Sequence, residues 1–233
     1  MLGHALTTFN PKNFTGIKLW LDAANPSNNA TTPTDGSFFN TWVDLSGVSG
    51  NAISFGGVDP LYKKSIQNGL PGILFNGTSD YMSVASLTMP PTMSMFTVST
   101  SSNNTLFIEH SVNVNSNDGF YIYGVGSSAA NVTRSGVSVQ QSDANWSGTS
   151  CVLLAMTYDG SNLLGYKNGS SAFSSTGSLS GNTTTASLYV GARGGSSLFM
   201  TGYIFEIILY SGLLTAGQQA LVNDYLRRKW AIY

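Results

Sequence analysis

The carboxylates that could serve as acid and base catalysts are scarce in this sequence. Glu109 and Glu206 are its only glutamates, and neither has an acidic residue two positions away. Glycoside hydrolysis uses a pair of carboxyl groups that flank the scissile bond. Glu206 stands alone in the apolar run YIFEIILY, where it could be a buried acid with a raised pKa. We favour the alternative, a carboxylate that closes a local hydrogen bond, and we expect no enzyme.

Nucleophilic and zinc chemistry also lack their residues. The chain has two histidines, His4 and His110, and one cysteine, Cys151. A Ser–His–Asp site needs an oriented histidine, and no G-x-S-x-G motif occurs. One cysteine and two histidines do not complete a tetrahedral zinc site without carboxylates. Cys151 opens the apolar run CVLLAM, so we expect it to be buried as a small hydrophobic side chain.

Calcium is the metal that the sequence best accommodates, although no cofactor is required by any motif. This ion prefers oxygen ligands from Asp, Asn and backbone carbonyls on loops. Asp80 in NGTSDY and Asp118 in NSNDG are the candidate Ca²⁺ ligands. The alternative interpretation is that both aspartates accept hydrogen bonds from their own turns.

Carbohydrate binding needs an aromatic platform with polar neighbours that fix the orientation of the sugar. Trp146 lies in the loop QQSDANWSGTS beside Asp143 and Asn145, so these three residues are the first candidates. Tyr121 and Tyr123 share one face of a predicted strand and are the second candidates. The other tryptophans, Trp20, Trp42 and Trp230, are expected in the core.

Charge is unusually low and gives no footprint for nucleic acid. Asp, Glu, Lys and Arg make up 9% of the residues, and the net charge is −1, whereas about 25% is typical. The single cationic cluster, at residues 227–229, complements the end of a predicted helix. The start of the chain does not resemble a signal peptide, and no apolar run has the length of a membrane span. We therefore expect neither a nucleic-acid nor a membrane partner.

Short strand-like runs separated by turn residues dominate the chain and predict an all-β sandwich or barrel. In the middle, Asp159–Gly160 and Asn168–Gly169 are tight-turn pairs that would fix the register of a hairpin. The serine- and glycine-rich tract at 170–181 is expected to be a loop. Besides GIKLWLD, the predicted strands are Ala52–Phe55, Gly72–Phe75, Tyr81–Val84, Met93–Thr100, Thr105–His110, Phe120–Val125, Gly136–Gln140, Val152–Tyr158, Leu163–Lys167, Ser187–Gly191 and Tyr203–Tyr210.

One helix is predicted near the C-terminus, in LTAGQQALVNDYLRRKW. Thr215 and Gln218 have the spacing of a capping box. An apolar stripe should pack this helix on the sandwich. The stripe consists of Leu221, Val222, Tyr225, Leu226 and Trp230. The preceding strand is apolar on both faces apart from Glu206, so we expect it to be covered on both sides.

Four segments resemble the laminin G-like, concanavalin A-like jelly-roll domains. They are LWLDAANPS with the following W-x-D-x-S-G, NGLPGILFNGTSDYM, LAMTYDGSNLLGYKNGS, and the closing stretch from LYVGARGG to LRRKW. The resemblance implies a two-sheet antiparallel jelly-roll sandwich with one C-terminal α-helix, over residues 16–233, after an N-terminal arm at 1–15. Several members of this family bind Ca²⁺ at the rim of the sandwich, so the resemblance makes Ca²⁺ a candidate ligand there. The E-x-D-x-E motif of similar jelly-roll glucanases is absent.

These features favour a non-catalytic binding or structural protein, made in the cytoplasm and displayed on a virion surface or outside the cell. We expect a virus or phage component that decorates a capsid or tail and binds host glycan. Near-zero net charge favours self-association, so a homo-oligomer or other virion proteins are the expected partners. A free-standing lectin is the alternative, followed by a glycosidase with a non-standard site.

Overall fold

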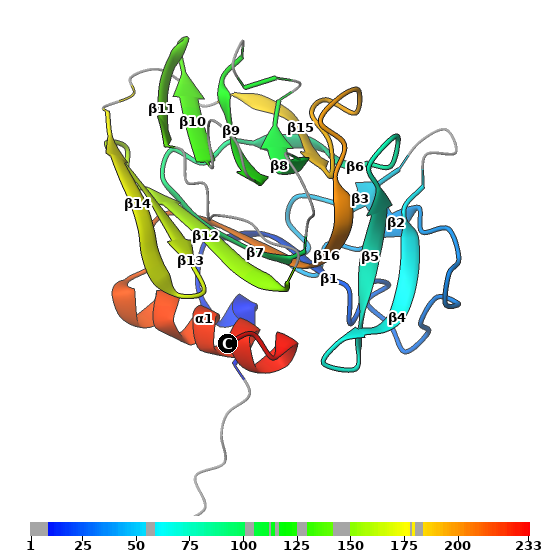
Figure 1. The fold of residues 1–233 in the computed structure, drawn as a ribbon. Coiled ribbons are helices and arrows are strands. Elements are labelled where there is room, and N and C mark those ends of the chain that lie inside the picture. Colours follow the sequence, from blue (N-terminus) through cyan, green and yellow to red (C-terminus); the bar gives the residue numbers. More distant parts are fainter. Residues whose placement is uncertain are drawn as a thin grey trace, which may run out of the picture.

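The computed structural model describes residues 9–54, 59–100, 105–111, 113–114, 117–124, 130–141, 150–177, 179 and 184–233. Within this part of the chain, sixteen strands form two stacked antiparallel sheets, and one α-helix lies beneath them (Figure 1). The predicted all-β, two-sheet jelly-roll sandwich with a C-terminal helix is confirmed. No helix in the described part of the chain has the length and apolar character needed to cross a membrane.

Sheet A has eight strands in the order β14-β13-β12-β7-β16-β5-β4, with β1 paired to β16. The longest strand, β16, pairs with β1, β5 and β7 and therefore fixes their register. The strands of sheet A are β1 (Ile17–Asp22), β4 (Leu61–Gln67), β5 (Leu70–Asn76), β7 (Met93–Ser99), β12 (Val152–Tyr158), β13 (Asn162–Lys167), β14 (Ser170–Thr176) and β16 (Thr201–Ser211).

Sheet B has the order β11-β10-β9-β8-β15-β6-β3-β2. It joins segments that are far apart in the sequence, because β15 pairs with both β6 and β8. The strands of sheet B are β2 (Thr41–Trp42), β3 (Ala52–Ile53), β6 (Met82–Thr88), β8 (Thr105–His110), β9 (Gly119–Gly124), β10 (Ala130–Arg134), β11 (Val137–Gln141) and β15 (Thr185–Val190).

The hairpins of sheet A show how local sequence sets register. Asn168 and Gly169 have φ of 52° and 79°, which a two-residue turn of type I′ requires. This confirms the second predicted turn. The expectation that the tract from 170 onward is a loop is wrong for Ser170–Thr176, which forms edge strand β14. Serine has low intrinsic strand preference, but Phe173 is buried and anchors the strand to the core, so packing outweighs propensity.

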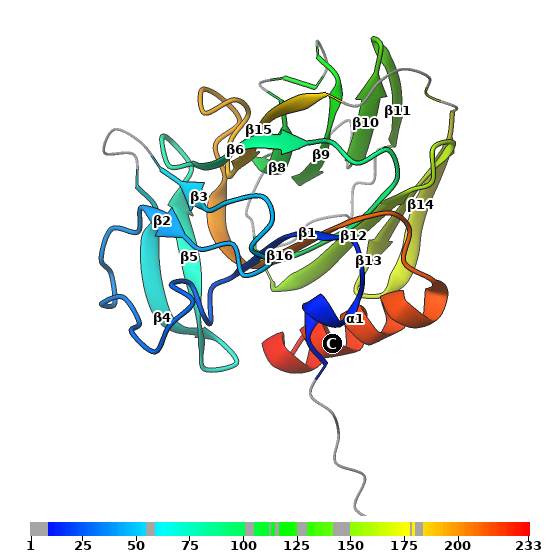
Figure 2. The same cartoon turned by 180° about the vertical axis from the view of Figure 1, so that it is seen from behind.

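Helix α1 (Ala216–Trp230) covers the face of sheet A that points away from sheet B (Figures 1 and 2). The predicted capping box is present: Thr215 Oγ1 accepts from the Gln218 backbone N–H, and the Gln218 side chain accepts from the Thr215 N–H. Trp230 is fully buried, whereas Leu221 is 51% exposed. The predicted apolar stripe is therefore wrong at Leu221, which lies one residue outside the buried i, i+4, i+8 row that ends at Trp230.

The described part of the predicted N-terminal arm packs on its own domain. A short 3₁₀ helix, η1 (Pro11–Asn13), is held by a 3.0 Å hydrogen bond from the Tyr210 hydroxyl to the Pro11 carbonyl. The ring of Phe9 lies 5.5 Å from that of Tyr225 on α1, and Phe14 lies 6.4 Å from Tyr210. These contacts extend the cover of sheet A. Residues 1–8 lie outside the described residues.

Candidate functional site

The outer face of sheet A is closed around one buried carboxylate, Glu206. Its Oε1 accepts hydrogen bonds from Trp20 Nε1 and Tyr225 OH, both at 2.8 Å. Its Oε2 accepts from Lys229 Nζ at 2.8 Å and Trp230 Nε1 at 2.7 Å. Glu206 thus accepts hydrogen bonds as predicted, but its donors come from β1 and α1, which are distant in sequence. We call this arrangement the Glu206 cluster.

Lys229 also links the Glu206 cluster to a second buried acid, Asp22, at 2.6 Å. Burial and the nearby charge of Glu206 raise the pKa of Asp22 from 3.8 to about 6, although the contact with Lys229 opposes the shift. Burial would lower the pKa of Lys229, but attraction to Glu206 and Asp22 outweighs it, so that pKa is raised. These groups satisfy one another, which leaves no polar group of the cluster for a ligand.

The other glutamate, Glu109, lies on sheet B and is also committed to the framework. Its side chain is fully buried. Both oxygens lie near Arg193 Nε, at 3.2 and 3.1 Å, and Oε1 accepts from the Val114 backbone N–H at 2.9 Å. Burial raises the pKa of Glu109, against the opposing effect of these donors. The ion pair ties β8 to the loop after β15, and the Val114 hydrogen bond ties the loop after β8 to the same carboxylate.

The outer face of sheet B carries a row of polar and aromatic side chains. Strand pairing sets Tyr189 opposite Glu109, Glu109 opposite Tyr121, and Tyr121 opposite Asn131. Tyr121 and Tyr123 share this face, with ring centres 6.2 Å apart, as the sequence predicts. Tyr121 is only 3% exposed, because Val114 and Leu106 pack on it, whereas Tyr123 is half-buried. The buried ring of Tyr121 has no free face for a sugar in this conformation.

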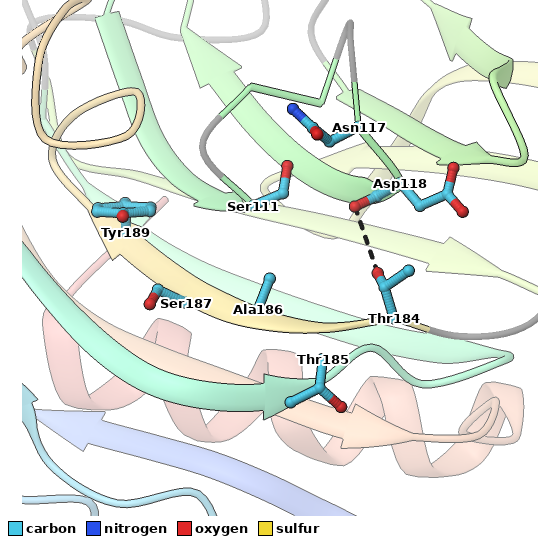
Figure 3. Close-up of a pocket in the computed structure, with 8 residues that line it drawn as sticks. All are labelled: Ser111, Asn117, Asp118, Thr184, Thr185, Ala186, Ser187 and Tyr189. Carbon is cyan, nitrogen blue, oxygen red and sulfur yellow. Dashed lines mark hydrogen bonds between the residues drawn. The ribbon is translucent and has the colours of Figure 1, made fainter.

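Farther along the same outer face lies a pocket of about 450 Å³. Ser187 and Tyr189 of β15 alternate with Leu188 and Val190, which belong to the core, so they point outward into it. Ser111, Asn117 and Asp118, from the chain between β8 and β9, lie on the opposite wall (Figure 3). The pocket is lined by Ser111, Asn117, Asp118, Thr184, Thr185, Ala186, Ser187 and Tyr189.

The pocket combines an aromatic end with a wall of neutral hydrogen-bonding groups. Tyr189 lies at one end and Asp118 toward the other (Figure 3). The ring of Tyr189 lies 6.2 Å from that of Tyr81. Ser111 is 4% exposed, and its Oγ has no hydrogen-bond partner among the described residues. A buried hydroxyl without a partner is unfavourable, so Ser111 adds an unmet hydrogen-bonding group beside the pocket.

Asp118 is the one predicted metal ligand that falls in this pocket. Its Oδ1 accepts a long hydrogen bond of 3.4 Å from the Gly136 N–H, and its carbonyl accepts from Thr184 Oγ1 at 3.4 Å. Each contact joins the start of β9 to the start of a strand that lies two positions away in sheet B. Asp118 therefore stands at the junction of β9, β11 and β15, a position that its sequence motif alone does not reveal.

Asp80, the other predicted metal ligand, lies in the turn after β5. Its two carboxylate oxygens accept from the backbone N–H of Asn76 at 3.0 Å and from the Asn76 side chain at 2.6 Å. These are the contacts of the turn interpretation. Within the described residues, no group of three or more His, Cys, Asp or Glu side chains could hold a metal ion. Calcium binding at Asp80 or Asp118 stays a prediction.

The first carbohydrate candidates, Trp146, Asp143 and Asn145, lie outside the described residues. Of the other tryptophans, Trp42 and Trp230 are fully buried, as expected, whereas Trp20 is half-buried. Sequence reasoning missed Ser111, Thr184, Ser187 and Tyr189 as pocket residues. The alternation in TASLYV could have placed Ser187 and Tyr189 on one face, but nothing local pairs β15 with β8.

A family model supplies the decisive comparison, since it matches residues 76–218, more than half of the chain. The chain belongs to the concanavalin A-like lectin/glucanases superfamily. No curated protein matches its sequence. The family match covers sheet B from β6 onward and the central strands of sheet A, so it includes all residues that line the pocket.

Solved structures of the superfamily fold extend the comparison. Domain 4 of AbnA, an extracellular arabinanase from Geobacillus stearothermophilus, in complex with arabinotriose, is 18% identical with a TM-score of 0.62, over 90% of this chain and 98% of that domain. The botulinum neurotoxin type G receptor-binding domain is 12% identical with a TM-score of 0.61, over 90% of this chain and 51% of that one. Trypanosoma rangeli sialidase in complex with sialic acid is 10% identical with a TM-score of 0.55, over 93% and 33%. At these identities the shared property is the fold.

Proposed function

We propose that this protein is a non-catalytic carbohydrate-binding protein whose ligand occupies the pocket on the outer face of sheet B. The observation that carries the proposal is the composition of that pocket, which has a tyrosine at one end and serine, threonine and asparagine side chains along its walls. Aromatic rings pack on the C–H faces of sugars, and neutral polar groups orient the hydroxyls. Its volume of about 450 Å³ is in the usual range for small-ligand sites.

The similar structures support the same function. A domain that this chain matches over 98% of its length was solved in complex with arabinotriose. The fold also occurs in a toxin receptor-binding domain. Both are parts of proteins that recognise a ligand, and neither similarity reaches the identity at which a ligand could be transferred. The proposal is therefore for carbohydrate as a class.

The non-catalytic part of the proposal rests on the two glutamates. Glu206 lies under α1 on sheet A, and Glu109 lies under Arg193 on sheet B. Hydrolysis of a glycosidic bond needs two carboxyl groups that face one substrate. These two face different sides of the sandwich and are fully engaged by their own donors, which supports binding without cleavage.

A panel of immobilised oligosaccharides, followed by calorimetric titration of the sugars that bind, tests the proposal. The variant Ser187→Trp should fill the pocket and abolish binding. The matched control Ser174→Trp places the same residue on an exposed position of β14 in sheet A and should leave binding unchanged. Equal binding by both variants, with unchanged melting temperatures, would contradict the proposed site.

A finer proposal concerns where the protein is located and what it assembles with. Low charge and near-zero net charge support a place on a virion surface or outside the cell, either as a homo-oligomer or bound to virion proteins. The mass of the protein in solution, measured with and without Ca²⁺, tests this. A discrete oligomer supports the decoration role, and a stable monomer favours a free-standing lectin.

A further inference from the structure

We propose that the pocket on sheet B selects neutral sugars over acidic ones, and that Asp118 is the residue that sets this selectivity. The inference rests on the proposed carbohydrate-binding function and deepens it. It concerns the charge of the ligand, which the family and the similar structures leave open.

Asp118 is the only residue with a formal charge at neutral pH among the described residues that line the pocket. The other walls present the Asn117 amide, the hydroxyls of serine and threonine, and the Tyr189 phenol (Figure 3). A carboxylate accepts strong, charge-assisted hydrogen bonds from hydroxyl groups. Figure 3 shows the Asp118 carboxylate at the end of the pocket opposite Tyr189, turned away from the other labelled side chains. A neutral sugar that extends to this end meets an anionic acceptor there and neutral partners along the walls.

The cations of the chain are placed elsewhere. Of its ten Lys and Arg residues, eight belong to sheet A or to the helices that cover it, and two, Arg134 and Arg193, lie on the side of sheet B. The eight are Lys12, Lys18, Lys63, Lys64, Lys167, Arg227, Arg228 and Lys229. An anionic ligand in the pocket would depend on the remaining two arginines for compensation.

Both arginines are committed to framework contacts. Arg193 Nε is paired with Glu109, and its guanidinium lies 5.8 Å from the centre of the Tyr121 ring. Arg134 Nη2 donates to the carbonyls of Pro90 and Pro91 at 2.9 and 2.7 Å, and its guanidinium lies 5.7 Å from the Tyr158 ring. Arg134 is also only 5% exposed. Arg193 Nε and Arg134 Nη2 thus already have acceptors within the protein, so an anionic ligand would compete with these contacts for either guanidinium.

A uronic or sialic acid would therefore bring its carboxylate beside Asp118 without a counter-charge. Moving a charge out of water without a partner is unfavourable, and a like charge nearby adds repulsion. A neutral hexose or pentose brings no charge that must leave water and meets no repulsion, and its hydroxyl groups donate hydrogen bonds to Asp118. The same residue thus attracts one class of ligand and repels the other, which is a source of specificity.

The test compares matched neutral and acidic oligosaccharides by calorimetric titration on the full chain. The pairs are lactose with 3′-sialyllactose, mannotriose with the mannuronic acid trimer, and xylotriose with its glucuronic acid-substituted form. Wild-type protein should bind the neutral member of a recognised pair at least about tenfold more tightly, which corresponds to about 1.4 kcal/mol. Asp118→Asn should narrow this ratio to near one.

Asp159→Asn is the matched control, because Asp159 lies in an exposed turn of sheet A and the change alters the net charge equally. It should leave the ratio unchanged. Tighter binding of the acidic member, abolished by Ser187→Trp, would overturn the selectivity and leave the proposed function intact. Absence of all binding, or binding that Ser187→Trp does not affect, would overturn the proposed function and the selectivity together. Equal melting temperatures of Asp118→Asn and wild type exclude unfolding as the cause.

Discussion

The two outer faces of this sandwich use polar groups in opposite ways. On sheet A, Glu206 receives four hydrogen bonds from groups that β1 and α1 bring to it. On sheet B, within the part of the chain that the structure describes, the pocket beside β15 keeps an unpartnered, buried Ser111 hydroxyl and a carboxylate, Asp118, whose hydrogen bond from Gly136 is long. Polar groups that satisfy one another hold the fold together. Polar groups with few partners beside an open pocket are the ones that a ligand can use.

Substitution of Glu206 should give the largest effect of all, a loss of stability without a loss of sugar affinity. Glu206→Leu leaves two indole N–H groups and the Tyr225 hydroxyl without this acceptor, and it leaves Lys229 with Asp22 as its acidic partner. We therefore expect a loss of about 3–5 kcal/mol in the free energy of unfolding. Urea denaturation measures it. Asp224→Ala, which breaks an exposed pair with Arg227 and Arg228, is the control and should have a much smaller effect. Loss of sugar affinity in folded Glu206→Leu protein would break the distinction between the faces.

The same cluster should make stability depend on pH through Asp22. Its pKa is about 6 in the folded protein, against 3.8 as its ordinary value, so between these values the folded state binds more protons than the unfolded state. Stability then falls as pH rises. Relative to Asp22→Asn, which does not titrate, wild type should lose up to about 3 kcal/mol between pH 3.5 and 7. Urea denaturation of both proteins across this range that shows a constant or rising difference would contradict the assignment.

Substitution of Arg193 should affect both stability and sugar binding, since Arg193 pairs with a buried carboxylate and also supports the wall of the pocket. Arg193→Met removes the partner of buried Glu109, and we expect a loss of about 1.5–3 kcal/mol. The loop that Glu109 holds through Val114 contains Ser111, so sugar affinity should fall as well. Denaturation and calorimetric titration of the same variant test both parts. A stable variant with wild-type affinity would show that the pocket does not depend on this ion pair.

The smallest expected effect concerns Cys151, the residue that precedes β12 on sheet A. Burial raises the pKa of its thiol to about 12, and the thiolate is the reactive species. Alkylation by iodoacetamide at pH 8 should therefore be much slower than for a free thiol, and it should become fast in urea. Mass spectrometry of timed samples measures the rate. Fast reaction of the folded protein would show that this edge of sheet A is open.

Prediction from the sequence succeeded where the signal is local. The strand alternation, the Asn168–Gly169 turn and the Thr215–Gln218 capping box each depend on a few neighbouring residues, and each is confirmed. It failed at β14, because burial of Phe173 outweighs a serine-rich sequence. The pocket could not be predicted, since Ser111 and Ser187 meet only through the pairing of β8 with β15. The turn motif predicts Asp118 as a metal ligand, and the structure places it at the border of the pocket.

Hydrogen–deuterium exchange with and without a saturating neutral sugar tests the central claim most directly. In this account, sheet B binds the sugar and sheet A stabilises the fold. The sugar is the tightest neutral binder of the oligosaccharide panel. We expect added protection in peptides from β15 and from the segment around Ser111 and Asp118, with no change in α1. Protection confined to α1 or to the strands beneath it, with β15 unchanged, would contradict the account.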